Sequence, residues 1–308
     1  MESGEAAERR GAPERGWVND FRRWRPIALL VSASMLIAYA SAAVAGDSVV
    51  VTIVDGRKAK ADITLVNPNG GDYTAEFELE FEAEGLQNLT PECVGITADV
   101  LDATEIANIK QRLPHSAHQD VAPGFPVRVT VEPPAACGLT FQNHYDVTFE
   151  TEDLVYTPGG PYRLVKAPLG GLFHYVTGSV TQGSVRSRGR AGGFSEFVII
   201  ADNAPTFTAD CESEYDVLQG RIDAASMSPT ARQALTVDLA ISRAAYEAHN
   251  YADAIQRLAI FDQHCVEYAG AALPNVWRSA RDTDNVEGDL VGNTDSLRFM
   301  MGRLSGQP

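Results

Sequence analysis

The sequence predicts an α+β protein with separate domains, an antiparallel β-sandwich followed by a small all-α bundle. Two periodicities support this fold class. Within residues 46–203, apolar and polar residues alternate with a period of two, which is typical of strands that bury one face. Within residues 210–308, apolar residues recur every three or four positions, which is typical of amphipathic helices. Gly- and Pro-rich turns separate the expected strands, as in sandwich folds, immunoglobulin-like ones included.

Ahead of the first expected strand, an apolar run covers residues 27–45. The basic stretch RRWR precedes this run, and the run ends in the small residues AVA, which together are the parts of a secretory signal peptide. We expect residues 1–45 to be a signal peptide that is removed, so that the mature protein is secreted or periplasmic and has no membrane attachment. An uncleaved N-terminal anchor is the alternative, because the run approaches the length that spans a bilayer.

Two neighbouring segments are expected to form an antiparallel hairpin. In residues 73–82 apolar residues alternate with polar ones, mostly glutamates, and in residues 58–65 they alternate with polar residues that include Lys58 and Lys60. The turn sequence NPNGGD separates the two segments, and the lysines of one strand can pair with the glutamates of the other. Further strands are expected at residues 48–54, 127–131, 139–149, 172–180 and 193–200, and a short helix at residues 104–113.

The last third of the chain is expected to be helical at residues 214–225, 229–248, 251–266 and 297–304. Ser228 followed by Pro229 is typical of a helix start. An amphipathic pair of helices followed by the runs LPNVWRSARD and DSLRF resembles the FIMAH-type helical module at the C-terminus of exported bacterial proteins. The resemblance covers roughly residues 218–304 and implies a secreted protein with an accessory module. It implies no catalytic residue.

Four cysteines follow the expected cleavage site, and they form no CxxC pair. An even number of cysteines in an exported chain predicts disulfides. Each expected domain contains two of them, so pairing within domains predicts the bonds Cys93–Cys137 and Cys211–Cys265. The second bond requires the first helix to cross the others steeply, or residues 204–213 to fold back along the bundle, because in an up-down-up bundle its cysteines lie at opposite ends.

The expected mature chain is strongly acidic. Residues 46–308 hold 19 Lys and Arg against 36 Asp and Glu, a formal net charge of −17. Such a surface repels phosphate backbones, which require Lys and Arg for binding. Nucleic acid is therefore excluded as a partner, and an unknown protein or surface partner is expected.

The most ligand-like cluster comprises His115, His118 and Asp120. Two imidazoles and a carboxylate at this spacing can bind a transition metal. The cluster follows a proline in an expected loop, where polar residues collect without a binding role. We therefore expect a polar surface loop, with no metal and no cofactor.

Other polar patterns have structural explanations. The sequence GFSEF around Ser195 departs from the nucleophile elbow G-x-S-x-G because Phe197 replaces the second glycine. Alternation places four glutamates on one strand face, whereas glycosidases use two carboxylates that face each other. The acidic residues 282–289 do not follow the EF-hand pattern. Three arginines alternate along an expected strand, which gives a solvated face or a surface for an acidic partner. The four glutamates are Glu76, Glu78, Glu80 and Glu82, and the three arginines are Arg186, Arg188 and Arg190.

The sequence thus predicts an exported, non-enzymatic binding or surface-assembly protein. The sandwich pattern and the lack of a catalytic motif in the mature sequence support this prediction. The alternative is a secreted hydrolase or a metal-dependent enzyme that uses the loop at residues 114–124.

Overall fold

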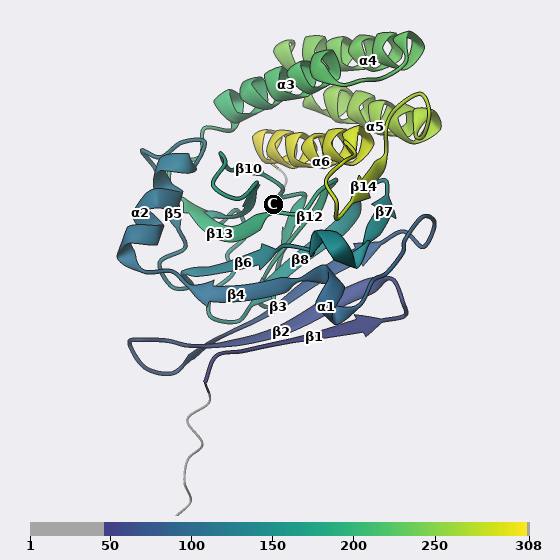
Figure 1. Cartoon of the computed structure of the whole chain (residues 1–308). Coiled ribbons are helices and arrows are strands. Elements are labelled where there is room, and N and C mark those ends of the chain that lie inside the picture. Colours follow the sequence, from purple (N-terminus) through teal and green to yellow (C-terminus); the bar gives the residue numbers. More distant parts are fainter. Residues whose placement is uncertain (1–45, 307–308) are drawn as a thin grey trace, which may run out of the picture. The chain divides into compact units, whose positions relative to one another are not determined.

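Two large antiparallel sheets, one two-stranded sheet and a group of helices make up residues 46–306, the part of the chain that the computed structural model describes (Figure 1). The expected signal peptide at residues 1–45 lies outside the described residues. The predicted fold class, an antiparallel sandwich followed by helices, is confirmed. The described residues 46–306 belong to one compact unit.

The first sheet has the strand order β1-β2-β3-β8-β12-β11. Its strands are β1 (Ser48–Val54), β2 (Lys58–Val66), β3 (Asp72–Phe81), β8 (Tyr145–Thr151), β12 (Val185–Ala191) and β11 (Ser179–Thr181). The predicted hairpin is confirmed as β2 and β3. The nitrogen of Lys58 lies 3.3 Å from Glu78 and 3.2 Å from Glu80, and Lys60 pairs with Glu76, so the two polar faces attract each other as expected.

The second sheet has the strand order β10-β9-β13-β6-β4, and β5 also pairs with β13. Its strands are β10 (His174–Tyr175), β9 (Tyr162–Ala167), β13 (Glu196–Asp202), β6 (Val127–Val131), β4 (Ile96–Val100) and β5 (Gln119–Val121). Strand β13 is buried on both faces. Phe197 and Ile199 join the core between the sheets, whereas Val198 and Ile200 join the core beneath the helices. The unbroken apolar run in β13 follows from this position.

Four short elements complete the sandwich. They are helix α1 (Pro91–Val94), helix α2 (Ala103–Arg112), a 3₁₀ turn (Ala135–Cys137) and strand β7 (Thr140–Gln142). Helix α2 matches the short helix expected at residues 104–113. Asp102 caps its first turn, and Glu105 bonds back to the Asp102 backbone, which satisfies the first free N–H groups.

Four long helices follow: α3 (Phe207–Ala224), α4 (Pro229–Glu247), α5 (Tyr251–Tyr268) and α6 (Val286–Leu304). Helices α4 and α5 agree with the prediction. Helix α3 begins seven residues before the expected start, and α6 begins eleven residues before the helix expected at residues 297–304. Helix α6 is buried on most of its sides, so its sequence lacks the one-sided apolar period that reveals a surface helix.

The helical part also contains a strand, β14 (Val276–Arg278), which pairs with β7. The expectation of an all-α bundle is therefore wrong at this point. The change from strands to helices lies between β13 and α3, close to residue 203. The helices share one hydrophobic core with β13 and β9, and the separate folding of residues 46–203 and 210–308 stays a prediction.

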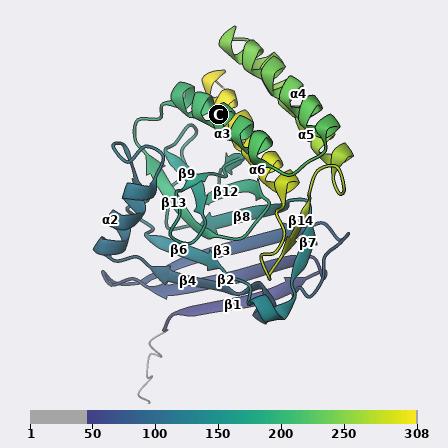
Figure 2. The same ribbon diagram turned by 45° about the horizontal axis from the view of Figure 1, so that its top comes forward.

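Glycines allow α6 to lie directly against the backbone of β12 and its neighbours, as the rotated view also shows (Figure 2). A Cβ atom at Gly292 would lie 2.6 Å from the carbonyl oxygen of Arg190. A Cβ atom at Gly288 would lie 2.5 Å from the Cα atom of Gly192. Glycine is unfavourable inside helices, so its presence here reflects the close contact.

The predicted Cys93–Cys137 disulfide is confirmed, with 5.6 Å between the Cα atoms. The predicted Cys211–Cys265 disulfide is wrong, because both cysteines are free and buried. Helix α3 packs on α4 and α6, and so does α5. The two thiols have different acidic neighbours. Burial raises the pKa of each thiol.

Candidate functional site

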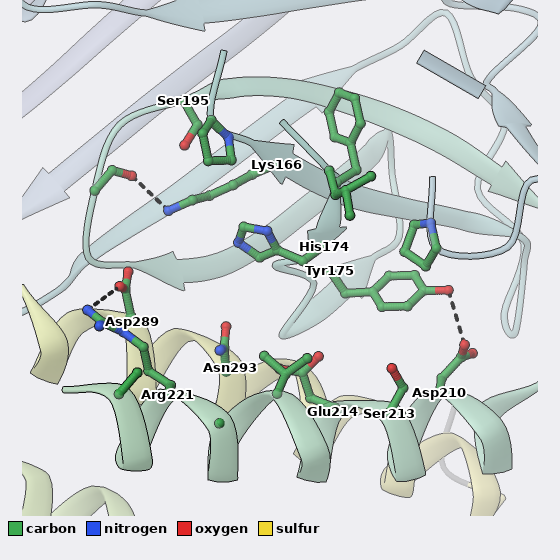
Figure 3. A pocket seen from close by; sticks show the side chains of 18 of the residues that line it. Lys166, His174, Tyr175, Ser195, Asp210, Ser213, Glu214, Arg221, Asp289 and Asn293 are labelled. Carbon is green, nitrogen blue, oxygen red and sulfur yellow. Dashed lines mark hydrogen bonds and ion pairs between the residues drawn. The ribbon is translucent and has the colours of Figure 1, made fainter. Parts of the chain in front are cut away.

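A cavity of about 760 Å³ lies between the second sheet and helix α3 (Figure 3). Strands β9 and β10, the segment before β13, the loop after α2, and helices α3 and α6 all contribute to its lining. Figure 3 shows side chains that extend from the strands on one side and from α3 on the other. The volume lies within the range of about 300–1,000 Å³ that is usual for small-molecule sites.

Much of the cavity wall is apolar. Phe173 and Phe194 contribute aromatic rings from the sheet side, and Val217 contributes an aliphatic side chain from α3. Leu172 is 75% exposed and Val217 is 45% exposed, although both line the cavity. The cavity therefore opens to the surface between apolar side chains, where an apolar molecule can enter.

Lys166 is the buried cation of this cavity. It lies near the end of β9, between His174 of β10 and Phe197 of β13, and only 5% of its surface is exposed. Its Nζ donates a hydrogen bond of 2.8 Å to the carbonyl oxygen of Gly193. Within residues 46–306, no carboxylate lies close enough to Lys166 to form an ion pair. Burial lowers the pKa of Lys166 to about 8, against a smaller opposite effect of Asp289, so the ammonium form predominates at pH 7.

Glu214 lies on the α3 side of the same cavity. Asp210, Glu214, Val217 and Arg221 line it because residues spaced by three, four and seven positions share one face of a helix. Glu214 is 5% exposed, and its Oε1 has no hydrogen-bond partner among residues 46–306. Burial raises the pKa of its carboxyl to about 8, with a further contribution from Asp210. The carboxyl is therefore mostly neutral at pH 7 and can donate a hydrogen bond.

Asp289 of α6 forms an ion pair with Arg221 at one end of the cavity. The distance from Arg221 Nη2 to Asp289 Oδ2 is 2.9 Å, and Arg221 also pairs with Asp284. His174 lies between this pair and Tyr175 in Figure 3. Burial and the charge of Lys166 lower the pKa of His174 to about 3, so its imidazole is neutral.

In the structure each member of the histidine cluster binds a different charged partner. His115 Nε2 lies 2.5 Å from Asp210, His118 Nδ1 lies 2.9 Å from Asp202, and Asp120 lies 2.6 Å from Lys110. The two imidazole rings stack with 5.3 Å between their centroids. Among residues 46–306, no group of three or more side chains is arranged to hold a metal ion.

The loop nevertheless reaches the cavity, because Pro114 and His115 form part of its wall. Asp210, which binds His115, also lies 3.4 Å from the hydroxyl of Tyr175. Burial raises the pKa of Asp210, whereas His115 opposes this effect. The loop is thus held by the first turn of α3, which is distant in sequence.

Two serines, Ser195 and Ser213, also line the cavity. Ser195 directly precedes β13 and is followed by strand sequence, so it lies on no nucleophile elbow. Within the described part of the chain, no hydrogen bond joins either hydroxyl to His115. A base bonded to a nucleophile, which acyl transfer by serine requires, is therefore not assembled in this arrangement.

The remaining polar patterns are structural in the described residues. The three glutamates of β3 bind lysines of β2, Glu82 follows the end of β3, and Arg186 and Arg190 bind acidic residues of β8. In the acidic segment before α6, Asp284 binds Arg221 and Asp282 lies 3.5 Å from Arg278. The contacts of the strands are cross-strand ion pairs, and those of the acidic segment are ion pairs with α3 and β14.

Sequence reasoning missed Lys166 and Glu214. A lysine within the apolar stretch YRLVKAPL of β9 is the one signal that could have revealed the first. Glu214 lies among other acidic residues of α3, and only the packing of α3 on the sheet buries it.

Among residues 46–306, the helices are either too short or too polar to cross a membrane. Nothing among the curated proteins or the solved structures matches the chain. Residues 32–305 match the model of a protein family described as a family of unknown function, DUF6689. Because the match covers most of the sequence, the chain belongs to the DUF6689 family.

Proposed function

We propose that this is an exported, non-enzymatic binding protein that holds a small, largely apolar molecule in the cavity between the second sheet and α3. The observation that carries the proposal is a cavity of about 760 Å³ that opens between exposed apolar side chains. An apolar molecule that buries about 200 Å² there gains about 5 kcal/mol from its removal from water. Lys166 and Glu214 give the same cavity the few polar contacts that orient a ligand.

The disulfide supports the part of the proposal that concerns export. Disulfides such as Cys93–Cys137 persist in oxidising compartments and are rare in the cytosol. The signal-peptide pattern at residues 1–45 and the resemblance to helical modules of exported proteins lead to the same compartment. Secretion or periplasmic location is therefore part of the proposed function, as is a role in transport or surface assembly of the bound molecule.

Binding of a neutral fluorescent probe, N-phenyl-1-naphthylamine, tests the proposal. We expect saturable binding with one probe per chain. Val217→Trp places an indole at the cavity mouth and is expected to weaken binding at least tenfold. Val237→Trp is the matched control, because Val237 is 49% exposed on α4 and does not line the cavity. The proposal would be contradicted if both variants bound the probe as tightly as the wild type, or if the probe did not bind saturably at all.

A hydrolase that uses the 114–124 loop is the second candidate. It is favoured by the contact of His115 with Asp210 in a cavity that also contains Ser195 and Ser213. An imidazole held by a carboxylate acts as a base when a nucleophile reaches it. Hydrolysis of p-nitrophenyl esters that is lost in His115→Ala would support this candidate, and a rate equal to that of buffer alone would exclude it.

A further inference from the structure

Lys166 carries a positive charge into the cavity without a negative partner. Moving a charge out of water is costly unless the charge is paired or fully hydrogen-bonded. The ammonium group has three N–H donors, and the structure shows one bond, to Gly193. Two donors of a buried cation are thus left for a ligand.

We propose that the natural ligand of the cavity is a monocarboxylate with an apolar body, and that its carboxylate binds the ammonium group of Lys166. This inference rests on the proposed function, because it specifies the molecule that the cavity holds. An ionised carboxylate accepts hydrogen bonds from ammonium groups in short, strong contacts. Binding would pair the cation that the protein itself leaves unpaired.

Glu214 is suited to the same carboxylate. Its carboxyl is buried in the cavity, and its Oε1 lacks a partner among the described residues. In the neutral form it donates a hydrogen bond to an anion and does not repel it. Asn293, which points into the cavity from α6, adds an amide.

The other titratable groups of the cavity do not neutralise the positive charge of Lys166. They are Asp289 paired with Arg221, Asp210 bonded to His115, and the neutral His174. The cavity is therefore locally suited to an anion although the whole sequence has a formal charge of −16. A single cation matches a single negative charge, which favours a carboxylate over a phosphate dianion.

The apolar body of the ligand follows from the apolar side chains of the cavity wall. Phe173, Leu172 and Val217 offer rings and aliphatic groups but no charge. Such a surface gains from contact with an alkyl chain or an aromatic ring. The chemical class is thus a fatty acid of medium length or an aromatic acid.

Octanoate and 1-octanol provide a matched pair of test ligands, since they share the alkyl chain and differ in charge. Each would displace N-phenyl-1-naphthylamine from the purified protein at pH 6.5. We expect octanoate to bind at least tenfold more tightly than octanol, because a charge-assisted contact is present only with the acid. Equal affinities, or tighter binding of octanol, would overturn the proposal of a carboxylate ligand and leave the proposal of an apolar ligand standing. Absence of binding by the probe and by both ligands would overturn the proposed function as well.

Lys166→Met removes the charge and keeps a long side chain, and Lys60→Met on β2 is the matched control outside the cavity. In Lys166→Met the ratio of the two affinities is expected to fall to about one, whereas Lys60→Met is expected to retain it. Retention of the ratio in Lys166→Met would assign the preference to another group and overturn the inference. Thermal melting verifies that both variants are folded, and the comparison in the unaltered protein decides the question without them.

Discussion

Replacement of Glu214 by glutamine is expected to stabilise the protein in a strongly pH-dependent way. The folded structure raises the pKa of this carboxyl from 4.5 to about 8, since burial disfavours the ionised form. Between these two values the folded protein binds more protons than the unfolded chain, so the free energy of unfolding falls as the pH rises. Linkage places the loss of unfolding free energy between pH 5 and pH 8 at about 3 to 4 kcal/mol. Glutamine resembles the neutral carboxyl in shape and does not ionise, so the variant is expected to escape this loss.

The assay is urea denaturation of the wild type and of Glu214→Gln at pH 5 and at pH 8. Other titrating groups are common to both proteins, so their contributions cancel in the difference between them. At pH 5 the two proteins are expected to differ by less than about 1 kcal/mol, and at pH 8 the variant is expected to be more stable by about 3 to 4 kcal/mol. Glu212→Gln, at an exposed position of the same helix, is the control and is expected to change little. Equal stability of wild type and Glu214→Gln at pH 8 would refute the burial of an ionisable carboxyl.

Three further predictions follow from other parts of the fold. Reduction of the Cys93–Cys137 disulfide opens a loop with a sequence separation of 44 and is expected to cost about 4 kcal/mol in urea denaturation; a loss below 1 kcal/mol would contradict its structural role. Gly292→Ala is expected to lower the stability by at least about 2 kcal/mol because its methyl group meets the β12 backbone, whereas Gly220→Ala, in open space on α3, is expected to raise it by about 0.5–1 kcal/mol. Octanoate affinity is expected to fall as the pH rises through about 8, because Lys166 loses its charge there, and a flat profile between pH 7 and pH 10 would contradict this.

Strand and helix periodicities were sufficient to predict much of the fold. The β2–β3 hairpin has one buried and one solvated face, so its alternation is visible and even its lysine–glutamate pairs could be expected. Helices α4 and α5 each have one exposed side and show a helical period for the same reason. Elements buried on several sides carry a weaker signal, which is why the first eleven residues of α6 were not predicted to be helical.

The pairing of the cysteines depended on geometry that the sequence does not contain. Cys93 and Cys137 were paired correctly because both lie in the sandwich, where α1 and the 3₁₀ turn that contain them lie side by side. Cys211 and Cys265 were expected to meet within a small bundle. In the structure α4 and α6 contact both of their helices, and the thiols remain apart as buried core residues.

The cavity could not be predicted from local sequence because distant segments form it. Lys166 of β9 and Glu214 of α3 lie on different elements, and neither has a neighbour in sequence that marks it as functional. The histidine cluster was noticed, but its partners Asp202 and Asp210 come from β13 and α3. Only the packing of α3 on the second sheet decides which of these groups share one space.

A crystal structure of the protein with octanoate tests the central claim most directly. The structure is expected to show one octanoate between the second sheet and α3, with its alkyl chain against Phe173 and Val217. One carboxylate oxygen is expected within about 3.2 Å of Lys166 Nζ. An empty cavity at a saturating concentration of octanoate, or an ordered ligand elsewhere with Lys166 still bonded to Gly193 alone, would contradict the claim.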